Sequence, residues 1–309
     1  MASASWTTMP ERGSVWAIRS LFFTLNVLGY RIASALLLPI VAYFFITGSK
    51  SRAASRDYLA RLNRFNPSEL ASSLAQSYLH HLQFAQALLE RVLLWQGKVE
   101  QFQIAATGRE LLEHPDKTGV LLVGSHLGSF DVMRVLALGL ARPIHVVMYR
   151  SHAKQINRFL EELNPNSNLR VIELEPGDYS GVIELRASVN RGEHIAILAD
   201  RHPPGVKKRA SRVPFLADEA EFPVSPWLLA ELLGCRVVLA TAVRTGCRKY
   251  TVSMDLLFDR VVLPKEDREL HVRKYILSFV KRIEGLCCAH PLQWFNFYNF
   301  WDSPESGKD

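Results

Sequence analysis

The sequence is poor in the residues that form disulfide frameworks and metal sites. Only four cysteines occur among 309 residues, and none of them forms a C-x-x-C pair. Two of them, Cys287 and Cys288, are neighbours, which is a poor geometry for an ordinary disulfide. Because there is also no cluster of Cys and His at ligand spacing, we expect reduced, cytosol-facing thiols and no zinc site.

Acidic residues are nearly absent from the N-terminal region. From Arg12 to Arg56 there is no Asp or Glu, whereas there are six basic residues, counting these two arginines. Within this region, the 18 residues between Arg31 and Lys50 are uncharged and mostly apolar, and Pro39 would kink a helix that they form. A membrane-spanning helix needs roughly 17–25 residues, so this segment is at the lower limit.

Three interpretations of this apolar segment are open. It forms a single membrane span, a hairpin or helix lying in the membrane interface, or a buried helix of the globular core. The flanking basic residues favour association with a membrane, and their presence on both sides argues against a cleaved signal peptide. If the segment spans a bilayer, Lys50, Arg52 and Arg56 predict that the rest of the chain stays cytoplasmic.

The rest of the chain has no internal repeat, and its hydrophobic pattern predicts an α/β fold. Residues 55–95 have apolar positions at helical spacing. From about residue 100, short apolar strands alternate with helices, which indicates a central, mostly parallel sheet flanked by helices. The expected strands are 120–123, 144–148, 170–174, 195–199, 236–242 and 250–257, and the expected helices are 130–141, 152–163, 181–191, 225–233 and 267–288.

One short stretch, residues 119–131, has the pattern most typical of a catalytic site. An apolar run ends at Gly124, a Gly/Ser-rich turn follows with His126, and a helix pattern opens with Asp131 in its first turn. A His at the carboxyl end of a strand lies where open α/β folds place their chemistry. Asp131 would then fix the imidazole tautomer and stabilise the imidazolium. The alternative is a helix-capping Asp beside a surface His.

The same turn lacks a nucleophile. Residues 124–128, Gly-Ser-His-Leu-Gly, have the spacing of the G-x-S-x-G nucleophile elbow, but His126 occupies the serine position. This argues against an α/β-hydrolase. A general base without a protein nucleophile suits direct attack of an acceptor hydroxyl on an activated acyl group.

These features resemble the bacterial lipid A lauroyl and myristoyl acyltransferases, within the lysophospholipid acyltransferase superfamily and its H-x4-D motif. The resemblance extends over the length of the chain, from the apolar basic N-terminus through several motifs in order. The motifs are His126-Leu-Gly-Ser-Phe-Asp131, Met148-Tyr-Arg150, Ile197-Leu-Ala-Asp200-Arg-His and Arg212-Val-Pro-Phe-Leu216. It implies an O-acyltransferase that needs no metal or tightly held cofactor and takes its acyl group from acyl carrier protein.

The resemblance also implies roles for single residues. His126 and Asp131 match the catalytic dyad of the family. Arg150 matches a Tyr-Arg element that would hold an acceptor phosphate or stabilise the oxyanion, and Asp200 matches an Asp after a hydrophobic strand, which we assign to substrate binding. The alternatives are an ordinary charged strand end for Arg150 and a turn residue for Asp200.

Three departures from the family pattern leave the acceptor open. Lipid A enzymes often carry Glu at the position of Asp131. Residues 217–226 replace the small residue and Thr-rich helix start of the family. The aromatic C-terminal run at 291–301 is closer to relatives found with aryl-polyene and other polyketide-like lipid pathways, and it forms either part of the core, which is favoured, or an interfacial belt.

A basic loop follows Asp200. It contains Arg201, Lys207, Lys208 and Arg209, which we assign to substrate binding. Such a loop would dock the acidic helix of acyl carrier protein or the phosphates of a lipid headgroup. A solvated loop is the alternative.

These observations lead to one hypothesis and two alternatives. We expect an N-terminal membrane-associating segment (1–56), an acyltransferase domain (57–302, helical to residue 100 and α/β from 101) and a polar tail (303–309). The enzyme would move a fatty or polyene acyl group from acyl carrier protein to a hydroxyl of a lipid or glycolipid, at the cytoplasmic face of a bacterial inner membrane. The alternatives are a non-catalytic membrane scaffold and a thioesterase that uses water. The net charge of +7 suits anionic lipid or an acidic protein, or solubility alone, and no nucleic acid partner is expected.

Overall fold

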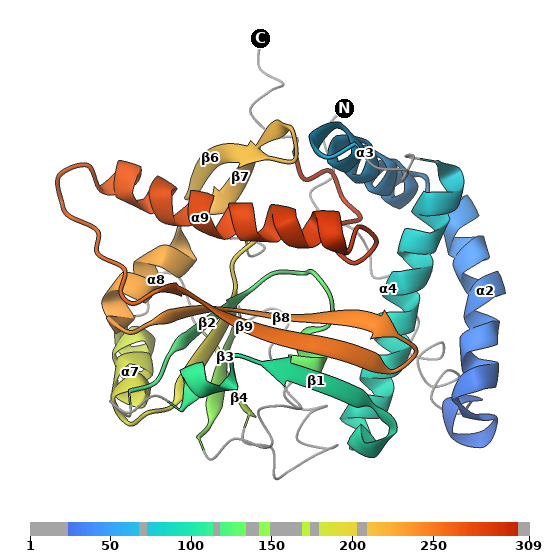
Figure 1. Cartoon of the computed structure of the whole chain (residues 1–309), viewed down its shortest axis with the longest axis horizontal. Helices are drawn as coiled ribbons and strands as arrows, with labels where there is room; N and C mark the ends of the chain where they lie inside the picture. Colours follow the sequence, from blue (N-terminus) through green and yellow to red (C-terminus); the bar gives the residue numbers. More distant parts are fainter. Residues whose placement is uncertain are drawn as a thin grey trace.

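The central element is a mostly parallel β-sheet. The computed structural model describes residues 24–67, 73–113, 118–133, 142–148, 169–173, 179–202 and 209–301. Within these ranges, seven strands pair in the order β1-β9-β8-β2-β5-β3-β4, and β8 with β9 is the one antiparallel pair (Figure 1). The strands are β1 (Gln103–Thr107), β2 (Leu121–Gly124), β3 (Ile144–Met148), β4 (Leu169–Glu173), β5 (His194–Leu198), β8 (Val237–Gly246) and β9 (Lys249–Phe258). The expected α/β class with a mostly parallel sheet is confirmed.

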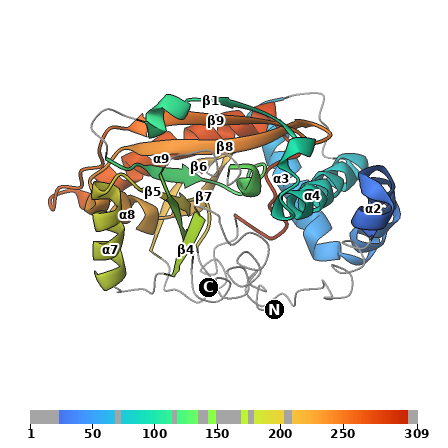
Figure 2. The same ribbon diagram turned by 90° about the horizontal axis from the view of Figure 1, so that it is seen from below.

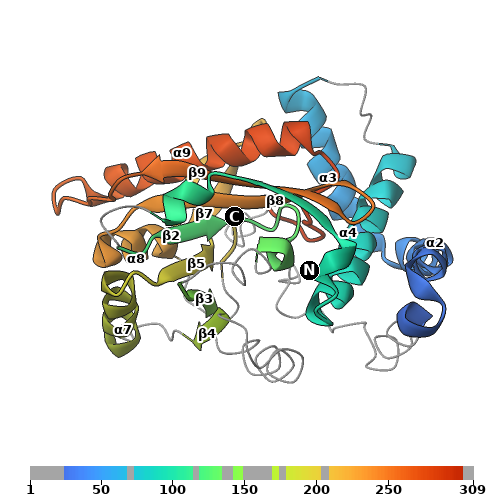
Figure 3. The same cartoon turned by 60° about the horizontal axis from the view of Figure 1, so that its bottom comes forward.

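Helices pack against the sheet, and two of them lie beyond it on one side. Figures 1 and 3 show α9 lying across one face, α7 and α8 at one end, and α4 between the sheet and α2. Seen from below, the sheet lies between α7 and α8 on one side and α4 and α2 on the other (Figure 2). The helices are α2 (Gly29–Thr47), α3 (Ser49–Phe65), α4 (Leu74–Trp95), α7 (Tyr179–Asn190), α8 (Ser225–Leu233) and α9 (Arg268–Ala289), with the 3-10 turns η2 (Val99–Gln101) and η3 (Arg109–Leu112).

Burial on both faces explains why the central strands are continuously apolar. All four residues of β2 are buried, and successive side chains contact opposite sides of the sheet. Leu121 and Val123 belong to one core cluster with Phe279 of α9, whereas Leu122 belongs to a second cluster with Leu94 at the end of α4.

Several elements differ from the sequence-based expectations. The helical region expected at 55–95 is two helices, because α3 ends at Phe65 and α4 begins after Ser73, whose Oγ accepts the N–H of Gln76 at 3.1 Å. The strand β1 and the hairpin of β6 (Ala210–Phe215) with β7 (Asp218–Pro223) were not expected. Of the helix expected at 130–141, residues 130–133 are helical and the rest lie outside the described residues, as does the helix expected at 152–163.

The apolar N-terminal segment forms α2. Within the described ranges, α2 is the one helix with the length and composition needed to cross a membrane. One stripe of it, Ala33, Leu37 and Val41, is buried against α4, and much of its remaining surface is exposed. The following helix, α3, runs through residue 56, where we expected a domain boundary.

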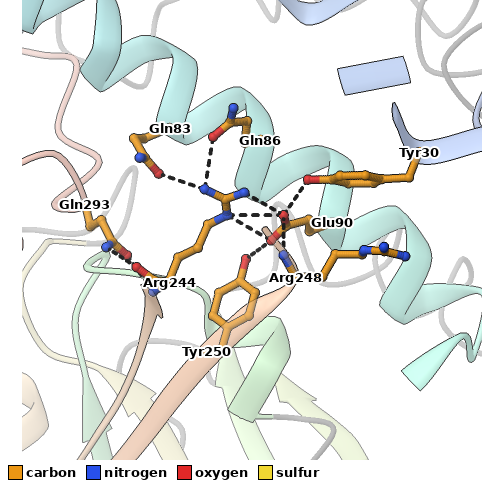
Figure 4. A network of polar contacts seen from close by, with 8 residues as sticks. All are labelled: Tyr30, Gln83, Gln86, Glu90, Arg244, Arg248, Tyr250 and Gln293. Atoms are coloured by element: carbon orange, nitrogen blue, oxygen red, sulfur yellow. Dashed lines mark hydrogen bonds and ion pairs between the residues drawn. The ribbon is translucent and has the colours of Figure 1, made fainter. Parts of the chain in front are cut away.

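A buried polar network joins α2, α4 and the β8–β9 hairpin (Figure 4). Its centre is the fully buried carboxylate of Glu90 on α4. Glu90 forms an ion pair with Arg244 at 2.9 Å and accepts hydrogen bonds from the hydroxyls of Tyr30 at 2.6 Å and Tyr250 at 2.5 Å. The main-chain N–H of Arg248 also donates to it, at 3.1 Å. Both carboxylate oxygens are therefore satisfied inside the protein, as a buried charge requires.

Candidate active site

The candidate catalytic loop, residues 125–129, leaves the carboxyl end of β2 and is fixed by main-chain hydrogen bonds on two sides. The N–H of Ser129 donates to the carbonyl of Ala242 in β8 at 2.8 Å. The carbonyl of His126 and the N–H of Gly128 bond to residues 293–295, at 3.0 and 2.8 Å. Gly128 has φ +74°, and a Cβ there would lie 2.0 Å from the carbonyl oxygen of Ala242, so only glycine fits this approach.

His126 is paired with Asp200 at the neighbouring strand end. Because β2 and β5 are adjacent and parallel, the loops that follow them meet at one edge of the sheet. The Nδ1 atom of His126 lies 2.8 Å from Oδ1 of Asp200, and the main-chain N–H of His126 donates to Oδ2 at 2.9 Å. Trp294 donates its indole N–H to the same Oδ2 at 3.3 Å. Since an ionised carboxylate only accepts, Nδ1 carries the proton and Nε2 is left with the lone pair of a base.

The surroundings keep Asp200 ionised and His126 neutral. Burial opposes ionisation of Asp200, but the His126 imidazole, the hydrogen bonds from His126 and the charge of Arg201 outweigh it and hold the pKa of Asp200 well below its usual range. Burial and the charge of Arg201 lower the pKa of His126, although Asp200 acts in the opposite direction. The His126 side chain is nevertheless 35% exposed, so a substrate can reach it.

Asp131 has its carboxylate turned to α4. The indole N–H of Trp95 donates to its Oδ1 at 2.9 Å, and Nε of Arg91 lies 2.5 Å from its Oδ2. The structure thus puts Asp200 on Nδ1 of His126, where the motif led us to expect Asp131. Asp131 lies in the helical turn that starts at Phe130, and its side chain is held there by Trp95 and Arg91 of α4.

The other expected site residues have different outcomes. Arg201 is adjacent to Asp200, but its guanidinium donates to the carbonyl of Phe295 at 2.6 Å and lies over the ring of Tyr298 at 5.1 Å. Arg209 is exposed just before β6. Arg150, Lys207 and Lys208 lie outside the described residues, so their roles stay predictions.

Sequence reasoning did not predict the contacts that support the His126–Asp200 pair. Trp294 belongs to the aromatic run at 294–301, which is part of the core, as favoured from the sequence. His80 on α4 is fully buried, with Nδ1 3.0 Å from Ser55 Oγ and Nε2 3.0 Å from the carbonyl oxygen of Trp294. Burial lowers the pKa of His80 to about 3, so it is a neutral core residue that supports Trp294. Only the aromatic run offered a sequence signal for these contacts.

The depressed pKa of His126 predicts a pH profile. A general base must be unprotonated, so kcat/KM should rise with pH through the pKa of His126 and then stay level. Because that pKa lies below the usual value of about 6.5, the half-maximal point should lie below pH 6.5. Initial rates between pH 5 and 8, corrected for uncatalysed thioester hydrolysis, measure this. A half-maximal point above pH 7 would contradict the geometry.

Comparisons with known proteins identify the family of this chain. A family model described as bacterial lipid A biosynthesis acyltransferase matches residues 3–303. Among solved structures, the 1-acyl-sn-glycerophosphate (LPA) acyltransferase PlsC from Thermotoga maritima is 15% identical, covering 81% of this chain and 94% of its own, with a TM-score of 0.35. No curated protein sequence matches significantly. Because the family model covers nearly the whole chain, the protein belongs to the bacterial lipid A biosynthesis acyltransferase family, a family of membrane-associated lipid acyltransferases.

Proposed function

We propose that this protein transfers an acyl group from the thioester of acyl carrier protein to a hydroxyl of a lipid or glycolipid, at the cytoplasmic face of a bacterial inner membrane. The observation that carries the proposal is the pairing of His126 Nδ1 with the buried carboxylate of Asp200 at 2.8 Å. It leaves a neutral imidazole, partly exposed, next to a turn with no serine at the nucleophile position.

The proposed reaction is a direct transfer. Nε2 of His126 removes the proton from the acceptor hydroxyl, and the oxygen attacks the thioester carbonyl to give a tetrahedral oxyanion. Collapse of this intermediate breaks the carbon–sulfur bond, and the His126 imidazolium returns its proton to the departing thiolate. Asp200 holds the Nδ1–H tautomer and stabilises the imidazolium during the step.

Two observations on charge support an anionic substrate. Arg91 on α4 is partly exposed and pairs with Asp131, five residues after His126, so it lies beside the site. Arg209 adds an exposed cation at the start of β6. Together with the expected role of Arg150, these residues suit the phosphates of a lipid headgroup or of a carrier-protein prosthetic group.

The test is transfer from an acyl carrier protein thioester to bacterial glycolipid, with products identified by mass spectrometry. The wild-type chain should form acylated lipid, and His126→Gln should lower the rate by about 10²–10⁴-fold, because general-base catalysis contributes that much. Full activity of His126→Gln would overturn the mechanism. Free fatty acid without acylated lipid would identify a thioesterase, and binding without turnover would identify a scaffold.

A further inference from the structure

The two sides of α2 have opposite surroundings. Its buried stripe, Ala33, Leu37 and Val41, recurs every four residues and packs on α4. Its outer surface carries large apolar side chains that nothing covers among the described residues. They are Ile32, Leu36, Leu38, Ile40, Tyr43, Phe44 and Ile46, and Val27 and Leu28 just before α2 are also exposed. An apolar surface of this length is an interaction surface rather than an ordinary protein exterior.

The helix α4 accompanies α2 along its length. At the start of α2, the Tyr30 hydroxyl donates to Glu90. In the middle, the Tyr78 hydroxyl donates to the carbonyl of Leu38 at 3.0 Å, and at the end the Phe45 ring meets the His81 ring edge-on at 5.3 Å. The antiparallel pair therefore has no stretch in which α2 leaves the protein and becomes surrounded by lipid.

α4 is too polar to cross a bilayer beside α2. Immediately behind Tyr30 lies the Glu90–Arg244 ion pair, and Arg244 also contacts the side chains of Gln83 and Gln86, at 3.5 and 3.1 Å (Figure 4). Charged groups are costly in the hydrocarbon core of a membrane. Here the charged Arg244 belongs to the β8–β9 hairpin of the central sheet. A crossing by α2 would draw this hairpin into the membrane.

We infer that α2 lies along the membrane surface and sinks its outer apolar face into one leaflet without crossing it. The fitting partner is an anionic bilayer. Lys50 and Arg56 are exposed just after α2, and Arg52 donates to the main-chain carbonyls of Phe45 and Ile46 at the end of the helix. The described part of the chain up to residue 56 contains basic residues and no acidic one. Its charge is therefore positive, which suits an anionic lipid surface.

This arrangement places α2 and α4 between the lipid surface and the catalytic loop. Glu90 points to α2, whereas the next residue, Arg91, points to Asp131 beside the catalytic loop. The lipid-facing side of α2 and the catalytic loop are therefore separated by the widths of two helices, roughly 20 Å. The way in which α2 meets the membrane does not depend on the acyl donor or acceptor. It is therefore tested by the side of the membrane on which each end of α2 lies and by vesicle binding, without turnover.

Sided labelling tests whether α2 crosses. Asn26→Cys and Ser49→Cys, at exposed positions on either side of α2, are each made in a Cys247→Ser/Cys288→Ser chain, whose remaining cysteines are buried. In intact spheroplasts, a membrane-impermeant maleimide should label neither variant, and after lysis it should label both. Labelling of Asn26→Cys in intact spheroplasts would show that the two ends lie on opposite sides and would overturn the inference.

Matched substitutions test the lipid-facing side. Ile46 on α2 is 71% exposed and Ile183 on α7 is 70% exposed, so Ile→Glu at either position leaves the core intact. On vesicles of phosphatidylethanolamine and phosphatidylglycerol, Ile46→Glu should lower the partition coefficient about tenfold, because it removes a buried apolar side chain from the interface. Ile183→Glu should stay within about twofold of wild type. Equal partitioning of the two variants would overturn the inference.

Discussion

Asp200→Asn is expected to lower acyl transfer by about 10³–10⁴-fold, whereas Asp131→Asn is expected to lower it only about tenfold. Asp200 accepts from Nδ1 of His126 at 2.8 Å and is fully buried, so an amide in its place can present its NH₂ group to Nδ1 and reverse the tautomer. The proton would then reside on Nε2, and His126 would no longer serve as a base.

At Asp131, the same substitution has a milder consequence. An Asn at this position still offers an oxygen to the indole N–H of Trp95, and the change removes the ion pair with Arg91. The contact between α4 and the first turn of the helix is thereby weakened, but the hydrogen bond at Nδ1 of His126 is kept. The H-x4-D resemblance predicts the reverse order, with Asp131 as the partner of His126.

Single-turnover rates with one acyl donor distinguish the two assignments. Both variants keep side-chain volume, and circular dichroism verifies that each is folded. The pH profile adds a second readout: loss of the Asp200 carboxylate removes a group that raises the pKa of His126, so the acid limb of residual activity should move to lower pH. If Asp131→Asn is the more severe variant, Asp131 acts as the motif implies and the Asp200 assignment is wrong.

The sheet could be predicted because its strands are buried on both faces. A strand such as β2, expected at 120–123 and found at Leu121–Gly124, shows as a continuous apolar run. The β6–β7 hairpin was missed for the opposite reason. Its turn residues, Leu216 and Ala217, have φ of +49° and +69°, a conformation usually signalled by Gly, Asn or Asp. Tertiary contacts hold this turn, since the N–H of Leu216 donates to Glu284 of α9 at 2.8 Å.

The site could be located from sequence, but its pairing could not. Strand ends place His126 and Asp200 at one edge of the sheet, and this much follows from the α/β pattern. Which carboxylate reaches Nδ1 depends on side-chain direction, and that depends on α4. Trp95 and Arg91 hold Asp131, and no local pattern near residue 131 reports a partner 36 or 40 positions earlier.

Glu90→Gln is expected to destabilise the fold by about 3–5 kcal/mol, because it leaves the buried guanidinium of Arg244 without its counter-charge. The amide also cannot accept all the hydrogen bonds that Tyr30, Tyr250 and Arg248 now donate to two carboxylate oxygens. Denaturant unfolding of the detergent-solubilised protein, followed by tryptophan fluorescence, measures the loss.

The matched control is Glu113→Gln, which breaks the exposed Arg109–Glu113 pair at 3.7 Å and should cost less than about 0.5 kcal/mol. If both variants cost the same, the Glu90 network does not stabilise the fold.

The Glu90→Gln substitution should also slow acyl transfer in the protein that is still folded, for a structural reason. The main chain of Arg244 bonds both ends of the Gln293 amide, at 2.8 and 2.7 Å, and the Gln293 carbonyl accepts from Gly128 in the catalytic loop at 2.8 Å. Glu90 thus fixes α2 and the catalytic loop to one framework, so its loss should affect membrane seating and catalysis together.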